Sequence, residues 1–309
     1  MADSKKLFLG VDIGGTKTAM VITDEALTRL AAREFKTQPR LGAPSLCDRI
    51  AATYDEMLAE LGLERSDITA AGVASPGPLD LAAGKIVFIA TMGFSDVPLV
   101  DMLRERLGMP VYLENDTNAA VIYESAFGAG AGYDTVAYVT VSTGIGCGIY
   151  ANGRVLDGAH SAAGEFGHII VERGGRLCGC GGRGCLEMYA SGTSIAEIAS
   201  GRLGRTLNTK EAFDLARAGD PIALGVIDEA CDHLGYALSM LYQTVDPGII
   251  VFGGSVTKDF DFIEEKILAA TKKYTEHIPG REIRFAITAL QGEQTVFGAA
   301  HFARVCSEG

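Results

Sequence analysis

An apolar strand, a glycine-rich turn and a second apolar strand occur twice in this chain. The first copy spans residues 7–23, with Asp-Ile-Gly-Gly-Thr-Lys as its turn. The second spans residues 136–150, with Thr-Gly-Ile-Gly as its turn. This repeat predicts two related lobes, each presenting one glycine loop at the end of a strand. At 309 residues and 48% hydrophobic side chains, the chain is large enough to form a core in each lobe.

The rest of the apolar pattern alternates between strands and helices, which predicts an α/β fold. Between Ser45 and Leu61 the apolar residues recur on one helical face, and Gly62 follows as a stop. The other predicted helices lie at 99–107, 117–127, 222–244 and 260–274, with a closing helix from residue 296, and the other predicted strands lie at 68–74, 111–113, 249–252 and 283–290.

The turn after the first strand has the composition of a phosphate-binding loop. Gly14 and Gly15 leave backbone N–H groups unobstructed, and Thr16 adds a hydroxyl. The Asp12 carboxylate can hold hydrated Mg²⁺. Thr16 and Lys17 stand in the reverse of the Walker A order, so a nucleotide must be held in another way. A tight hairpin that needs glycine only for positive φ is the alternative.

Two further glycine segments suit the same nucleotide. Thr143 and Gly144 begin the turn of the second hairpin. Gly253 and Gly254 lie between an apolar strand and a helix, where exposed backbone can hold an adenosine. A purely structural turn is the alternative for each segment.

Phosphoryl transfer to an alcohol requires a base that accepts the hydroxyl proton. Asp116 is the candidate, because it lies at the end of a predicted strand and immediately before the helix at 117–127. An aspartate in that position can also be a plain N-cap. The presence of both glycine loops favours the catalytic role.

One imidazole and three thiolates form a candidate metal site at His168, Cys178, Cys180 and Cys185. This ligand set suits tetrahedral Zn²⁺. Four protein ligands leave no open position, so we predict a structural zinc that holds a glycine-rich loop. Free thiols near an unrelated histidine are the alternative.

Two carboxylates flank this cluster, Glu165 in Gly-Glu-Phe-Gly-His and Glu187 in Cys-Leu-Glu. Carboxylates fixed beside a rigid metal site are suited to accept hydrogen bonds from a polyhydroxylated ligand. Solvation at the surface is the alternative for each of them.

Charge and cysteine content narrow the class of partner. The net charge of −12 argues against nucleic acid and favours a small-molecule ligand. Lys5 and Lys6 precede only a short apolar run that ends at Asp12. We therefore expect neither a signal peptide nor a membrane span, and a cytoplasmic protein. Seven cysteines without an export signal favour thiols and metal ligands over disulfides.

Together these motifs resemble the ROK family of sugar kinases, repressors and uncharacterised proteins, within the actin-like ATPase superfamily. The resemblance covers essentially the whole chain and is carried by the segments at 12–17, 76–80, 114–120, 143–146, 164–168, 178–187 and 246–254. It implies a two-lobed α/β, ribonuclease H-like fold with a central cleft and a zinc-stabilised loop. We predict a smaller lobe of residues 1–117 with 297–309 and a larger lobe of residues 118–296.

The resemblance also implies roles for the candidate residues. Asp116 is the base that takes the proton from the 6-hydroxyl of a sugar. The sugar pocket is lined by Asn115, Asp116, Glu165, His168 and Glu187, and His168 places one ring nitrogen on zinc. The donor is ATP with Mg²⁺, and homodimers or higher homo-oligomers are usual. Repressor members carry a DNA-binding helix-turn-helix ahead of the kinase-like body, which we do not expect here.

One departure from the family pattern concerns the acceptor. Where many glucokinase-like members have Pro-Asn-Leu-x-Trp, this chain has Ala-Thr-Met-Gly-Phe at residues 90–94. We predict ATP-dependent phosphorylation of a hexose, with glucose as the acceptor. An N-acetylglucosamine or N-acetylmannosamine kinase is the alternative enzyme, and a sugar-sensing actin-like protein without turnover is the non-enzyme alternative.

Overall fold

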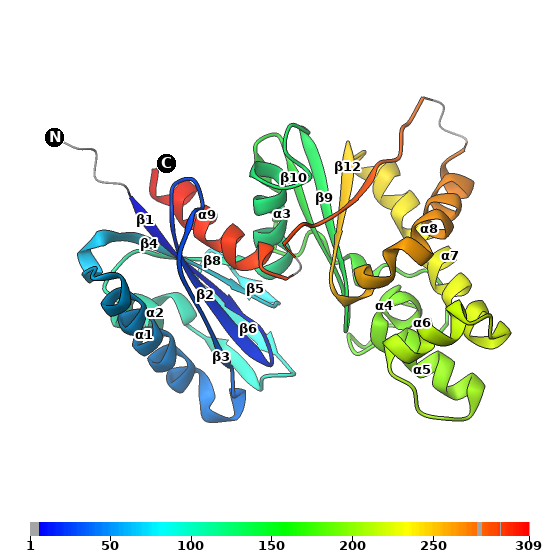
Figure 1. Cartoon of the computed structure of the whole chain (residues 1–309), viewed down its shortest axis with the longest axis horizontal. Coiled ribbons are helices and arrows are strands. Elements are labelled where there is room, and N and C mark those ends of the chain that lie inside the picture. Colours follow the sequence, from blue (N-terminus) through cyan, green and yellow to red (C-terminus); the bar gives the residue numbers. More distant parts are fainter. Residues whose placement is uncertain (1–5, 277–279, 291, 309) are drawn as a thin grey trace. The chain divides into compact units, whose positions relative to one another are not determined.

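The computed structural model describes residues 6–276, 280–290 and 292–308 (Figure 1). The chain packs into two compact units. The first is drawn from Met1–Phe127, Val155–Ala163 and Glu293–Gly309, and the second from Gly128–Arg154 and Gly164–Gly292. The lobe boundaries expected from the sequence stay a prediction: 1–117 with 297–309, and 118–296.

Two five-stranded sheets share one strand order. The first sheet runs β3 (Arg29–Lys36), β2 (Lys17–Asp24), β1 (Leu7–Ile13), β4 (Ile68–Ser75), β8 (Val111–Asn115). The second runs β11 (Arg154–Val155), β10 (Ile145–Ala151), β9 (Thr135–Val141), β12 (Ile249–Gly253), β13 (Phe285–Ile287). In both, the central strand forms an antiparallel hairpin with the next strand in sequence and pairs in parallel with a later strand. The predicted repeat is therefore confirmed.

Helices and short elements surround these sheets. The first unit holds α1 (Gly42–Leu61), α2 (Leu99–Leu107), α3 (Asp116–Ala126), α9 (Gln294–Glu308), the 3-10 helices Pro39–Leu41 and Arg65–Asp67, and a small sheet of β5 (Leu79–Asp80), β6 (Lys85–Ile89) and β7 (Phe94–Val97). The second holds α4 (Glu187–Ala190), α5 (Gly192–Leu203), α6 (Thr209–Arg217), α7 (Pro221–Thr244), α8 (Phe260–Thr275) and the 3-10 helices Phe166–His168 and Ser255–Asp259. Among the helices that the structure describes, none combines the length and apolar character needed to cross a membrane.

Most elements expected from the sequence are present. The helix expected at 45–61 begins earlier, at Gly42, and ends where Gly62 adopts a left-handed φ of 66°. The strand expected at 283–290 is shorter, because only Phe285–Ile287 pairs with β12. Strand β3 and the small sheet were not expected.

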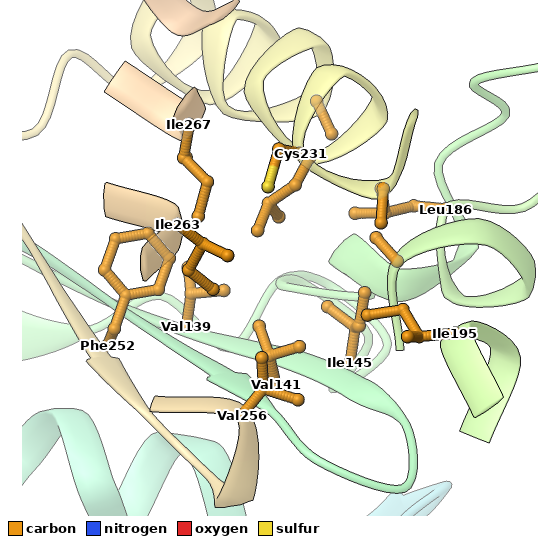
Figure 2. Packing of buried hydrophobic residues seen from close by; sticks show 14 of the residues in the cluster. Val139, Val141, Ile145, Leu186, Ile195, Cys231, Phe252, Val256, Ile263 and Ile267 are labelled. Atoms are coloured by element: carbon orange, nitrogen blue, oxygen red, sulfur yellow. The ribbon is translucent and has the colours of Figure 1, made fainter. Parts of the chain in front are cut away.

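The core of the second unit lies between its sheet and helices α7 and α8 (Figure 2). Val139 and Val141 of β9 and Phe252 of β12 belong to one buried cluster with Ile263 and Ile267 of α8. The alternation of these side chains along β9 is what a strand needs to bury one face. This core supports the turn between β9 and β10.

Helix α9 contacts the sheet of the first unit through its backbone. Gly10 of β1 and Gly72 of β4 are paired strand neighbours beneath it. A Cβ at Gly72 would lie 1.9 Å from the carbonyl oxygen of Ala299. On α3, a similar approach brings the carbonyl oxygen of Ala119 within 1.8 Å of a Cβ at Gly298. Close packing of α9 therefore ties α3 to the sheet.

We predict that Gly72→Ala destabilises the protein by about 3 kcal/mol, because the added methyl overpacks a backbone contact. Urea denaturation of wild type and variant measures this difference. Gly201→Ala is the matched control, since a Cβ there meets nothing within 4 Å and alanine favours the helix by up to about 1 kcal/mol. Equal denaturation midpoints for Gly72→Ala and wild type would contradict the packing argument.

Candidate active site

Three parallel strands of the first unit bring the acidic residues to one edge of its sheet. Asp12 of β1 pairs with Ala74 of β4, which in turn pairs with Glu114 of β8. Asn115 ends β8, and Asp116 begins α3 directly beyond it. The structure therefore places Asp116 near enough to Asp12 for its charge to act on the Asp12 carboxyl.

The Asp12 carboxyl resists ionisation in this position. Burial raises its pKa to about 7, the negative charge of Asp116 adds to the shift, and the Lys17 ammonium acts in the opposite direction. A divalent cation at this edge would favour the ionised carboxylate. Because carboxylate oxygens are preferred Mg²⁺ ligands, Asp12 fits the predicted magnesium role.

Asn115, and not Asp116, caps helix α3. The Oδ1 atom of Asn115 accepts from the backbone N–H of Thr117 at 2.9 Å and of Asn118 at 3.4 Å. Asp116 is the first helical residue, and its Oδ1 accepts from the Thr117 N–H at 2.8 Å. The alternative of Asp116 as a plain N-cap is therefore wrong. With its oxygen engaged, Asn115 retains its amide N–H groups for a ligand.

The first glycine loop is open to solvent. Gly14 closes the turn by donating its N–H to the carbonyl oxygen of Lys17 at 2.9 Å. Gly15 and Thr16 are exposed, and a Cβ built on Gly15 meets nothing within 4 Å. The ammonium of Lys17 lies 2.6 Å from the carboxylate of Glu34, and both side chains are exposed. A phosphate can therefore approach the backbone of this loop without displacing a side chain.

The second glycine loop is held by Glu187. An Oε2 atom of Glu187 accepts from the backbone N–H of Ile145 at 3.0 Å. A Cβ at Gly144 would lie 2.3 Å from the same carboxylate, so a larger residue there would push the Glu187 side chain away from the loop. The N–H of Ser142 closes the turn on the Gly144 carbonyl oxygen at 2.9 Å, and Thr143 is exposed. Glu187, predicted as a sugar ligand, therefore also holds the second glycine loop.

The Gly253–Gly254 segment lies beside that loop. The hydroxyls of Ser142 and Ser255 are 3.0 Å apart. Gly254 has a φ of 90°, and a Cβ there would lie 2.3 Å from the carbonyl oxygen of Val141. Both nucleotide segments predicted in the second unit therefore meet. Ser142 and Ser255 were not predicted, because only the pairing of β9 with β12 brings them together.

The four predicted zinc ligands converge in the second unit. Their ligand atoms all lie within 4.8 Å of one another. Cys178 Sγ is 3.7 Å from His168 Nδ1, and Cys180 Sγ is 3.7 Å from Cys185 Sγ. Zn–S bonds of about 2.3 Å give tetrahedral S···S separations of about 3.8 Å. The residues present therefore fit a closed, structural Zn²⁺ site.

His168 directs its other ring nitrogen towards Glu165. The Nε2 atom lies 3.8 Å from a carboxylate oxygen of Glu165, which is beyond hydrogen-bond distance. Both side chains are exposed. The pair can therefore accept and donate hydrogen bonds to a ligand while Nδ1 serves the metal.

A buried polar network below Asp116 was not predicted. Glu114 is 2% exposed, and its Oε1 accepts from the Asn118 amide at 3.0 Å and from the Asn115 N–H at 2.7 Å. The same Asn118 amide lies 3.3 Å from Asp157. Burial raises the pKa of Glu114 to about 7; hydrogen bonds from Asn118 and Asn115 oppose the shift, and Asp157 adds to it. Asp157 is 39 positions from Asn118 in the sequence, so no local sequence pattern predicts its place in this network.

Comparisons with known proteins point to one family. A model of the ROK family matches residues 8–305. A glucokinase from Halalkalibacterium halodurans is 33% identical over 310 residues, or 96% of this chain and 94% of that protein. An N-acetylmannosamine kinase from Yersinia pestis is 33% identical over 267 residues, or 85% of this chain and 88% of that protein. The crystal structure of a ROK family glucokinase from Streptomyces griseus in complex with glucose and AMPPNP matches with a TM-score of 0.81 and 32% identity, covering 97% of this chain and 99% of that one.

We predict that Glu114 makes stability fall as pH rises. Its folded pKa of about 7 exceeds the ordinary 4.5, so the folded state holds a proton that the unfolded state releases. The stabilisation is complete below pH 4.5 and is lost as pH rises to about 7. Relative to Glu114→Gln, wild type should lose up to about 3 kcal/mol of unfolding free energy across this window. Denaturant titrations at a series of pH values measure the unfolding free energy of both proteins. If the two proteins show the same pH dependence, the assignment to Glu114 is contradicted. Asp12 is present in both proteins, so its contribution to the pH dependence cancels in the comparison.

For the metal centre we expect about one zinc ion per chain, measured by elemental analysis of protein purified without chelators. Cys180→Ser removes one ligand and should lower both the zinc content and the thermal midpoint. Cys306→Ser, a thiol of the first unit, should leave the zinc content unchanged. Metal-free wild type would refute the site.

Proposed function

Because this chain belongs to the ROK family, we propose that it is an ATP-dependent kinase that phosphorylates the 6-hydroxyl of a hexose, with glucose as its acceptor. The actin-like ATPase fold expected from the sequence is confirmed by the similarity to the S. griseus glucokinase structure. One observation carries the proposed chemistry: Asp12 and Asp116 meet at one sheet edge. An open glycine loop adjoins them.

Asp116 acts as the general base. As the sugar oxygen bonds to the γ-phosphorus, its proton passes to the Asp116 carboxylate, and the bond from phosphorus to the departing ADP oxygen breaks. The N-terminus of α3 favours the ionised carboxylate that this role requires. A base of this kind contributes roughly 10²- to 10⁴-fold to the rate.

The glycine segments hold the nucleotide. Backbone N–H groups of Gly15–Lys17 and Thr143–Gly144 donate to phosphate oxygens, and Gly253–Gly254 lies against the adenosine. Asp12 would hold the hydrated Mg²⁺, which would neutralise charge on the phosphates. Retention of a proton by Asp12 weakens this interaction, so nucleotide binding improves as pH rises above 7.

The sugar is positioned by polar side chains. The Asn115 amide donates hydrogen bonds, and the Glu165 carboxylate accepts them. His168 fixes its ring through the zinc and offers Nε2. Glu187 shares its carboxylate between the sugar and the Ile145 N–H. Zinc itself has a structural role, because its four ligands leave no position for a substrate.

An N-acetylhexosamine is the second candidate acceptor. Thr91 stands where many glucokinase-like relatives have asparagine, and it is exposed. Phe94, in place of the tryptophan, is buried in β7. The N-acetylmannosamine kinase from Yersinia pestis is as similar in identity as the glucokinase from H. halodurans. The non-enzyme alternative, a sugar sensor, predicts binding without ADP release.

We place the enzyme in the cytoplasm as a homodimer or higher homo-oligomer, as the family resemblance implies. Light scattering coupled to size-exclusion chromatography tests the assembly. The ligands are a sugar and a nucleotide, and the net charge of −12 opposes binding to nucleic acid.

The decisive measurement is ADP release with Mg-ATP across glucose, mannose, fructose, allose, N-acetylglucosamine and N-acetylmannosamine. We expect glucose to dominate. Asp116→Asn should lower kcat by about 10³-fold without unfolding the protein, because the variant cannot accept the proton.

Asp101→Asn, an exposed change on α2, is the matched control and should retain full activity. If ADP release is greatest with an N-acetylhexosamine, that sugar replaces glucose as the proposed acceptor and the proposed mechanism is unchanged. Near-wild-type turnover by Asp116→Asn would exclude Asp116 as the base. Sugar binding without any ADP release would favour the sensor.

A further inference from the structure

Thr37, which follows β3, lies directly against the first glycine loop and is fully buried. Its hydroxyl donates to the carbonyl oxygen of Gly14 at 2.6 Å, and its backbone N–H donates to the carbonyl oxygen of Thr16 at 2.9 Å. The Thr18 hydroxyl lies 3.0 Å from the Thr37 hydroxyl and donates to it, because the Thr37 proton is already committed to Gly14. Thr37 therefore fixes two carbonyls of the loop, those of Gly14 and Thr16.

Arg49 of α1 holds Thr37 in turn. Its Nη1 donates to the carbonyl oxygen of Lys36 at 2.6 Å, and its Nη2 donates to that of Thr37. Its Nε donates within the helix to Ser45, and its guanidinium lies 5.2 Å from the centre of the Phe35 ring. A planar fork that spans two carbonyls is a role that lysine cannot reproduce.

These contacts determine where the N–H groups of the loop point. In a planar trans peptide the N–H points opposite to the C=O. Because the carbonyls of Gly14 and Thr16 face Thr37, the N–H groups of Gly15 and Lys17 face away from it. Gly15 is exposed and open, so its N–H is presented to a phosphate.

We propose that Thr37 and Arg49 are positioning residues for nucleotide binding, which hold the first glycine loop with its N–H groups towards the phosphates. The inference rests on the proposed function for the identity of the ligand. Neither residue belongs to a glycine or acidic motif, and neither is required to touch the nucleotide. Substitution of either residue should therefore lower the affinity for nucleotide and leave the affinity for sugar unchanged.

The test compares Thr37→Val with Thr37→Ser in the full, zinc-loaded protein. Calorimetric titration with Mg-ADP gives Kd, and steady-state kinetics give KM for ATP and for sugar. Loss of the hydroxyl bonds should raise the Kd for Mg-ADP and the KM for ATP about tenfold, and serine should restore both. The KM for sugar should change less than about twofold.

Thr23→Val is the matched control. Thr23 lies on β2 at the far end of the hairpin, and its buried hydroxyl has no hydrogen-bond partner among the described residues. The Thr23→Val substitution replaces the same hydroxyl by a methyl group at a position that does not contact the loop, so nucleotide affinity should be unchanged. Arg49→Lys is a second test that leaves Thr37 in place. This substitution should raise the Kd for Mg-ADP about threefold.

Wild-type affinity for Mg-ADP in Thr37→Val, or in Arg49→Lys if the first variant does not fold, overturns the inference. Failure of serine to restore affinity also overturns it. Nucleotide binding is measured without sugar, so a weaker Kd in Thr37→Val supports the inference even if no sugar is phosphorylated. That absence of turnover would contradict the proposed function alone.

Discussion

The register of the parallel strands in the first unit determines where its acidic groups lie. Asp12 is level with Ala74 and then with Glu114, so Asp116 follows at the same edge. A slip of one residue would turn each side chain to the opposite face. The same register pairs Gly10 with Gly72 beneath α9, where only glycine leaves room for the helix backbone. Packing of α9 therefore selects the register that assembles the acidic site.

Local patterns in the sequence predict those structural features that depend only on residues close together in the chain. The β1–β2 hairpin, the end of α1 at Gly62 and the clustering of His168 with the three cysteines each depend on a short segment, and the structure has them as predicted. The role of Asn115 was less accessible, because Asn and Asp are both good caps and only backbone geometry distinguishes them.

Residues that support the site from a distance could not be predicted in this way. Thr37 reaches the first loop only because β3 pairs with β2. Asp157 reaches Asn118 from 39 positions away in the sequence. The bond from Ile145 to Glu187 spans 42 positions. Each is an ordinary polar residue whose role is created by tertiary packing, so neither composition nor spacing marks it.

The zinc segment of the second unit gives Glu187 two fixed neighbours. Cys185, a predicted metal ligand, precedes it by two residues, and Leu186 between them is fully buried. On the other side, the Glu187 carboxylate bonds to the backbone of the second glycine loop. Leu186 belongs to the buried core of the unit, so the predicted metal site, this core and the second glycine loop are linked through residues 185–187.

Two carboxyls of the first unit share a pKa of about 7 but differ in what can reach them. Glu114 is only 2% exposed and is hydrogen-bonded to Asn118. A ligand therefore cannot reach its carboxyl and replace the proton. Asp12 is the penultimate residue of its strand, beside an exposed loop, and is the residue proposed to hold a magnesium ion. Similar desolvation therefore acts on two different roles: at Glu114 it makes the fold sensitive to pH, and at Asp12 it affects the carboxyl that is proposed to hold the magnesium ion of the nucleotide.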